Sequence, residues 1–125
     1  MGSLKRYCLL KQYEDYTPGP IDPDPTKSKI IMNKRVEEAL NDQIKKEASS
    51  SQYYLAMASW AESNGLNGTA SFMYTHSDEE RFHMLKLVKF VNERGGRAVV
   101  PQLEKPPHEF KNLKNVFQNY GIMKN

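Results

Sequence analysis

The sequence has a single cysteine, Cys8, among its 125 residues. One thiol excludes an internal disulfide and also a thiolate cluster for zinc or an iron–sulfur centre. Any metal ion must therefore be held by carboxylate oxygen and imidazole nitrogen. Apolar residues are also scarce, because hydrophobic types make up 38% of the chain against ~45–50% in an average globular protein. We expect a small core and a chain that is partly unfolded.

Long apolar runs are missing as well. No run approaches the roughly 18–20 residues that span a bilayer, and residues 1–10 are too short and too broken for a secretory signal. We therefore expect a soluble, cytoplasmic protein without a membrane partner. Lys and Arg number 18 against 15 acidic residues, and the two signs are interspersed along the chain. Because no basic stripe forms, nucleic acid is not an expected partner.

Proline is concentrated near the N-terminus. Four of the seven prolines lie at residues 18–25, where fixed φ angles and missing N–H donors prevent a helix or a central strand. Residues 1–31 are therefore predicted to form a flexible, proline-containing extension without chemistry of its own. Residues 32–125 are predicted to form the domain.

Two long segments without glycine or proline predict a helical hairpin. The first covers residues 33–64 with Asn33 as its N-cap, and an Asn-Gly pair at its end supplies a left-handed stop. The second covers residues 69–94 and ends at a Gly-Gly pair. Residues 97–110 are predicted to be an extended crossover, and Asn112 to cap a last short helix through Val116 and Phe117. The predicted fold class is all-α.

Each long helix carries one stripe of residues at helical spacing, and each stripe contains a carboxylate. These are Glu47 in the first helix and Glu80 in the second. A buried carboxylate needs a hydrogen-bonded counter-charge or a metal, and neither stripe contains Lys or Arg. The stripes consist of Val36, Leu40, Ile44, Glu47, Ser51, Tyr54 and Ala58, and of Met73, Ser77, Glu80, Met84, Leu87 and Val91.

The second stripe also borders an imidazole, since His83 follows Glu80 by three residues and Glu79 lies beside the same patch. Oxygen plus imidazole suits iron, manganese or zinc, and an inward Glu with Glu-x-x-His is the pattern of carboxylate-bridged di-metal sites in four-helix bundles. Two plainer interpretations stay open. Glu-x-x-His occurs on the solvated face of many charged helices, and Glu47 could lie at a helix rim beside a neighbouring Lys or Arg.

Other conspicuous side chains have structural interpretations. Tyr54 and Trp60 are expected to be core aromatics whose polar tips are satisfied by a neighbour. His76 is expected to face outward, and His108 lies in the crossover without ligand neighbours. The methionines expected in the core are Met57, Met73 and Met84.

Residues 47–55 (Glu-Ala-Ser-Ser-Ser-Gln-Tyr-Tyr-Leu) and 79–84 (Glu-Glu-Arg-Phe-His-Met) closely resemble the first two helices of non-haem bacterial ferritins. The loop at residues 64–68 and the Arg-Gly-Gly helix end at residue 94 are also similar to that family. The resemblance covers residues 32–118. It implies a ferritin-like helical hairpin, half of a four-helix bundle, preceded by an unrelated and disordered tail.

By this resemblance, Glu47 would be a ligand of the first iron, Glu80 the bridging carboxylate and His83 the nitrogen ligand of the first iron. Glu79 would match the carboxylate of an accessory third iron site, and Tyr54 the tyrosine beside the ferroxidase centre. The implied reaction is oxidation of two Fe(II) by dioxygen or peroxide, followed by storage of Fe(III) as a mineral in a hollow shell. Carboxylates suit that chemistry because hard oxygen ligands stabilise Fe(III).

The resemblance also implies a truncated domain. Complete relatives continue with third and fourth long helices whose glutamates close the second iron site, and the next of these positions falls here at about Lys124. A lone hairpin would leave its apolar stripes in water, so we expect a homo-oligomer or pairing with full-length ferritin subunits. A symmetric pair of hairpins would offer the whole ligand set of a di-iron site. The alternatives are a non-catalytic helical interaction module and an inactive remnant.

Overall fold

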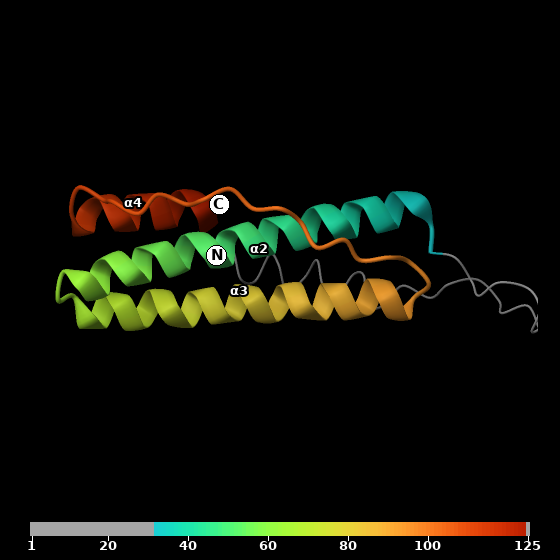
Figure 1. Ribbon diagram of the computed structural model, residues 1–125, viewed down its shortest axis with the longest axis horizontal. Coiled ribbons are helices and arrows are strands. Elements are labelled where there is room, and N and C mark those ends of the chain that lie inside the picture. The colour runs from blue at the N-terminus through green and yellow to red at the C-terminus, as the bar shows by residue number, and fades with distance from the viewer. Residues whose placement is uncertain (1–31, 125) are drawn as a thin grey trace, which may run out of the picture.

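The computed structural model describes residues 32–124, so the predicted extension at residues 1–31 lies outside the described residues. The described part consists of the helices α2 (Lys34–Ser63), α3 (Asn67–Glu93) and α4 (Leu113–Lys124). As Figure 1 shows, α2 and α3 form an antiparallel hairpin, and α4 lies beside α2 and runs in the direction of α3. The all-α prediction is confirmed. None of the helices described here is long and apolar enough to cross a membrane.

The two ends of α2 follow from local chemistry. Asn33 is the N-cap, and its side-chain oxygen accepts a hydrogen bond of 2.8 Å from the backbone N–H of Arg35. At the other end Gly65 has a φ of 73°, which glycine adopts without the steric cost that a Cβ brings. The predicted bounds of this helix, residues 33–64, are confirmed to within one residue at each end.

The start of α3 differs from the prediction. The sequence predicts a helix from residue 69, whereas α3 begins at Asn67 and includes Gly68. A hydrogen bond of 2.9 Å from the N–H of Ala70 to the carbonyl of Leu66 closes the first turn. Glycine inside a helix costs only about 1 kcal/mol relative to alanine, so a packed hairpin can retain it.

The crossover between α3 and α4 is extended, as predicted, and runs back along the hairpin (Figure 1). Asn41 of α2 holds it in place. The Asn41 amide donates to the carbonyl of Arg97 at 3.0 Å and accepts from the N–H of Val99 at 2.8 Å. The same amide therefore satisfies two backbone groups of a segment that has no strand partner in the described chain.

The last helix begins where predicted and extends further. Asn112 accepts a hydrogen bond of 2.9 Å from the N–H of Asn115, which makes it the cap of α4. The predicted helix ends near Phe117, but α4 continues to Lys124 across Gly121. Phe110 and Val116 bring this end of the chain into contact with α2, since both are buried in a cluster with its aromatic residues.

Two apolar clusters join α2 to α3, and the polar stripe residues lie between them along both helices. The expectation that a lone hairpin leaves its stripes in water is therefore wrong, because the stripes face each other and are largely buried. Exposed large apolar side chains lie elsewhere, for example Leu55 on α2 and Phe82 on α3. The first cluster consists of Met32, Leu40, Ile44, Leu87 and Val91, and the second of Tyr54, Met57, Ala58, Met73, Phe110 and Val116.

Candidate metal centre

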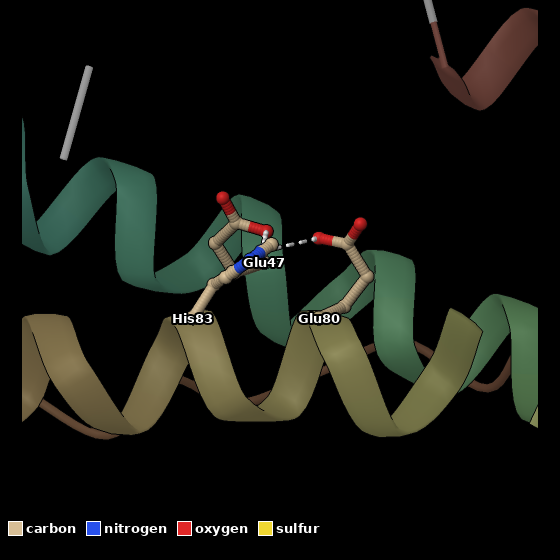
Figure 2. Close-up of side chains that lie close together, drawn as sticks. All are labelled: Glu47, Glu80 and His83. Carbon is tan, nitrogen blue, oxygen red and sulfur yellow. Dashed lines mark ion pairs between the residues drawn. The ribbon is translucent and has the colours of Figure 1, made fainter. Parts of the chain in front are cut away.

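Three of the predicted site residues lie together between the two apolar clusters. Glu47 projects from α2, and Glu80 and His83 project from adjacent turns of α3 (Figure 2). One ligand atom from each residue lies within 4.8 Å of the others. The Nδ1 atom of His83 is 3.9 Å from Oε2 of Glu47 and 3.8 Å from Oε2 of Glu80.

Burial distinguishes this cluster from a surface charge pattern. The side chains of Glu47 and Glu80 are each 1% exposed, and that of His83 is 18% exposed. A solvated helix face or an exposed helix rim, the two plainer interpretations of the sequence, does not fit carboxylates at this depth. Ionised carboxylates are placed in a helix interface only where charges or metals compensate their lost hydration.

The distances within the cluster leave room for an ion. The buried Nδ1 of His83 makes no hydrogen bond, since 3.8 and 3.9 Å exceed hydrogen-bond length. Ligand atoms bind ions such as zinc at about 2.0–2.2 Å, so two ligands of one ion lie roughly 3–4 Å apart. The spacing between His83 and both carboxylates agrees with that value. Two carboxylates and one imidazole form a donor set suited to iron, zinc or manganese.

The two carboxylates also determine the protonation of the imidazole. Glu47 on α2, and to a smaller extent Glu80 on α3, stabilise the charged ring and raise the pKa of His83 to about 9, although burial opposes the shift. At neutral pH, His83 is therefore an imidazolium paired with two carboxylates. An incoming metal ion must displace this proton, because a metal binds the neutral ring.

In the absence of metal, the protein is expected to lose stability as the pH rises from 6.5 to 9. The pKa of His83 is raised on folding, so its contribution is complete below pH 6.5 and is lost as the pH passes 9. Urea unfolding with a chelator present, measured below and above this range, checks the result. His83→Gln should flatten the decline, whereas His108→Gln in the crossover should leave it unchanged. Equal slopes for the wild type and His83→Gln would show that the ionisation of His83 does not contribute to the pH dependence of stability.

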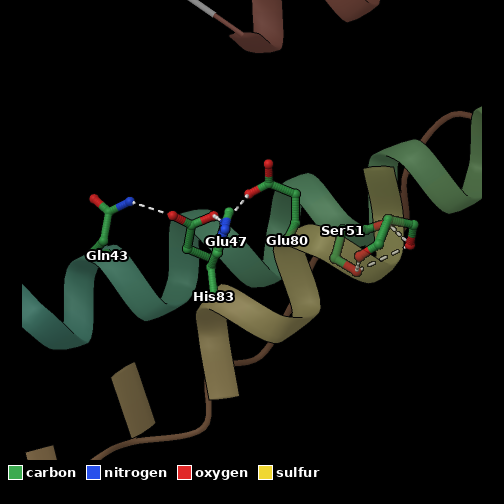
Figure 3. A network of polar contacts seen from close by, with 6 residues as sticks. Gln43, Glu47, Ser51, Glu80 and His83 are labelled. Carbon is green, nitrogen blue, oxygen red and sulfur yellow. Dashed lines mark hydrogen bonds and ion pairs between the residues drawn. The ribbon is translucent and has the colours of Figure 1, made fainter. Parts of the chain in front are cut away.

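Further polar residues flank the buried cluster (Figure 3). Gln43 donates a hydrogen bond of 3.0 Å from Nε2 to Oε1 of Glu47, and the other carboxylate oxygen, Oε2, is the one near His83. The sequence interpretation missed Gln43, although its spacing of four residues before Glu47 was a usable signal. Ser51 and Ser77 were placed in the predicted stripes without a role, and they bond to each other across the helix interface.

Tyr54 lies in the second apolar cluster, where it is fully buried. Its ring centroid is 6.0 Å from that of His76 and 5.5 Å from that of Tyr120 on α4. The expectation that His76 faces outward is wrong, because its ring also lies 4.3 Å from that of Phe72 and 5.4 Å from that of Tyr120. The side chain is off the main stripe of α3 and is half-buried against α4.

Glu79 lies apart from the buried cluster. Its side chain is exposed, and it does not belong to the group of three potential ligands. The structure thus brings together Glu47, Glu80 and His83, and leaves Glu79 at the solvent-facing border of the same helix.

The comparison with known families agrees with this arrangement. A model of the ferritin-like domain matches residues 37–120, which is most of the described chain. The chain belongs to the ferritin family. The matched range includes all of the residues of the buried cluster, both apolar clusters except Met32, and most of α4.

Individual ferritins resemble this chain over its helical part. A probable bacterial non-heme ferritin-like protein from Haemophilus influenzae is 42% identical over 88 residues, which are 70% of this chain and 53% of that protein. The bacterial non-heme ferritin of Campylobacter jejuni is 35% identical over 88 residues, with the same coverage of 70% and 53%. The chain therefore spans about half the length of these ferritins.

Solved structures show the same likeness. An open pore ferritin from the hyperthermophilic archaeon Archaeoglobus fulgidus superposes with a TM-score of 0.70 at 37% identity, covering 74% of this chain and 57% of that one. The ferritin of Chlorobium tepidum superposes with the same score of 0.70 at 31% identity. The predicted ferritin-like fold is confirmed.

Proposed function

We propose that this ferritin-like chain binds Fe(II) at Glu47, Glu80 and His83 and takes part in its oxidation to Fe(III) for storage. The observation that carries the proposal is the buried cluster of two carboxylates and one imidazole, whose ligand atoms lie within 4.8 Å of one another. The likeness to proteins named bacterial non-heme ferritins supports iron as the metal. Iron is the substrate here, and the protein supplies its ligands.

The three residues have different tasks in this proposal. Glu47 and His83 hold the first iron from opposite helices, and Glu80 bridges it to a second iron. Two ferrous ions each release one electron, and dioxygen takes up both electrons with two protons to give hydrogen peroxide. Tyr54 lies beside the site as a core residue, and the exposed Glu79 serves an accessory iron on the way to storage.

A second chain completes the site in the proposed active form. The described part of one chain contributes two carboxylates and one imidazole to the cluster, whereas di-iron sites in helical bundles use two glutamates and two Glu-x-x-His pairs. Two copies related by a two-fold axis supply that set. A full-length ferritin subunit could supply the remaining ligands instead, and the composition of the paired species separates these partners.

Anaerobic sedimentation of the chain with and without Fe(II) tests the proposal. We expect Fe(II) to shift a monomer to a dimer that holds two iron ions, because metal binding at a shared site favours association by mass action. Dioxygen admitted afterwards should convert the bound iron to Fe(III), which absorbs in the near ultraviolet. His83→Ala is the matched variant and should fail in both steps.

Each step can fail separately. A chain that stays monomeric at saturating Fe(II), or binds one iron without association, would contradict pairing between two copies of this chain. A chain that binds Fe(II) and does not accelerate its oxidation over free Fe(II) would contradict the proposed reaction and support a non-catalytic binding role.

A further inference from the structure

We infer that Ser51 and Ser77, here called the serine pair, position Glu47 against His83 and so set the geometry of the metal site. The inference rests on the proposed function, since it concerns the same site. Ser51 Oγ donates a hydrogen bond of 2.8 Å to the backbone carbonyl of Ser77, and Ser77 Oγ donates one of 2.8 Å to the carbonyl of Ser51. The two hydroxyl oxygens are 3.2 Å apart.

The reciprocal bonding of the serine pair is specific to one arrangement of α2 and α3. A serine within a helix commonly bonds to a carbonyl of its own helix one turn earlier. Here each hydroxyl crosses to the partner helix and finds the carbonyl of the residue that bears the other hydroxyl. A slide or rotation of one helix against the other breaks both bonds. The serine pair therefore fixes the position of α2 along the axis of α3, here called the relative height of the two helices.

Ser51 lies beside the candidate ligands in Figure 3, and Ser77 is bonded to it across the helix interface. Ser51 follows Glu47 by four residues, and Ser77 precedes Glu80 by three, so each serine is about one helical turn from a ligand. Ser77 is buried in the helix interface, and Ser51 is half-buried. The backbone between each serine and its neighbouring ligand is rigid helix. A change in the relative height of the two helices at the serine pair therefore also moves the ligands.

His83 lies near two carboxylates, and only its separation from Glu47 depends on the relative height of the two helices. Glu80 and His83 belong to α3, and their separation of 3.8 Å is set within a single helix. Glu47 belongs to α2, so its separation of 3.9 Å from His83 is set by the helix packing. Binding sites require their groups to be held within about 0.5 Å of the productive geometry. The serine pair therefore acts on the contribution of Glu47.

A Co(II) titration of the full chain tests the inference, with the visible spectrum of Co(II) as a readout of coordination geometry. We expect Ser51→Ala combined with Ser77→Ala to lower the affinity about tenfold or more and to change the spectrum. Ser51→Thr keeps the hydroxyl and should retain both properties. Ser49→Ala, at an exposed position of α2, is the matched control.

Two further measurements separate positioning from loss of stability. Val91→Ala removes methyl groups from the first apolar cluster and should lower the unfolding temperature without altering the Co(II) spectrum. In a double-mutant cycle, Glu47→Ala should cost less affinity in the serine double variant than in the wild type, because that variant has already misplaced this ligand. If the double variant does not fold, the single Ser51→Ala variant replaces it.

The outcomes distinguish the inference from the function on which it rests. A wild-type chain that binds no Co(II) or Fe(II) would contradict the proposed function itself. Binding by the wild type, with unchanged affinity and spectrum in the serine double variant, would contradict only the role of the serine pair. The same would follow if Val91→Ala changed the spectrum equally, or if the effects of Glu47→Ala and the serine variant were additive.

Discussion

Replacing Glu47 or His83 by alanine is expected to lower the affinity for Co(II) or Fe(II) at least about 100-fold, a larger loss than removal of an outer hydrogen-bond partner causes. Each substitution removes one of the three candidate ligand groups that the helix interface brings together. Helical content should stay nearly constant, because the apolar clusters on both sides remain. Calorimetric titration measures the affinity, and far-ultraviolet circular dichroism measures the helical content.

Glu79→Ala is the matched comparison for this prediction. Glu79 neighbours Glu80 on α3 but is exposed and outside the buried cluster, so its loss should weaken binding much less. Equal affinity in the wild type and in both cluster variants would show that the cluster is not the metal site. An effect of Glu79→Ala as large as that of His83→Ala would place the ion at the surface of α3.

Metal binding is expected to raise the unfolding temperature of the chain by about 10 °C or more. A ligand at 100 times its dissociation constant stabilises the folded state by about 2.7 kcal/mol, and each kcal/mol shifts the midpoint of a domain of this size by about 4–8 °C. We expect metal binding and folding to be strongly coupled because Glu47 and His83 come from different helices, so unfolding disperses the proposed ligands. Thermal unfolding with Co(II) and with a chelator measures the shift.

Variants test whether this stabilisation arises at the cluster. His83→Ala should unfold at the same temperature with Co(II) and with chelator. Val91→Ala should start from a lower temperature and still gain the full shift, because its side chain belongs to the first apolar cluster. A shift of equal size in the wild type and His83→Ala would assign the stabilising ion to another site.

Helix ends were predictable where a single residue decides them. Asn33 caps α2 with its own side chain, and Gly65 takes the left-handed conformation, so both signals act locally. The start of α3 was not predictable in the same way. Gly68 weakens a helix in isolation, and only the packing of the hairpin makes its inclusion in the first turn favourable.

The clustering of the three candidate ligands was predictable because they lie at helical spacing. Glu47 falls in phase with the apolar stripe of its helix, and Glu80 and His83 share adjacent turns of the next helix. The serine pair was beyond the same reasoning. Its hydrogen bonds join residues 26 positions apart and depend on the relative height of two helices, which periodicity along one helix does not specify.

The environment of His76 was also beyond prediction from the periodicity of a single helix. Its position beside the stripe of α3 suggests an outward side chain, but the aromatic ring of Tyr120 on α4 lies 5.4 Å away. That contact depends on where the crossover places α4 relative to α3. A contact between elements that are distant in sequence was therefore the feature that local patterns did not reveal.

The position of Co(II) in a crystal of the protein tests whether Glu47, Glu80 and His83 together bind a metal ion. Anomalous diffraction near the cobalt absorption edge locates the ion without reference to the protein atoms. We expect a peak within bonding distance of His83 Nδ1 and of carboxylate oxygens from Glu47 and Glu80. A peak elsewhere on the chain, or no peak in the helix interface at saturating Co(II), would contradict this expectation.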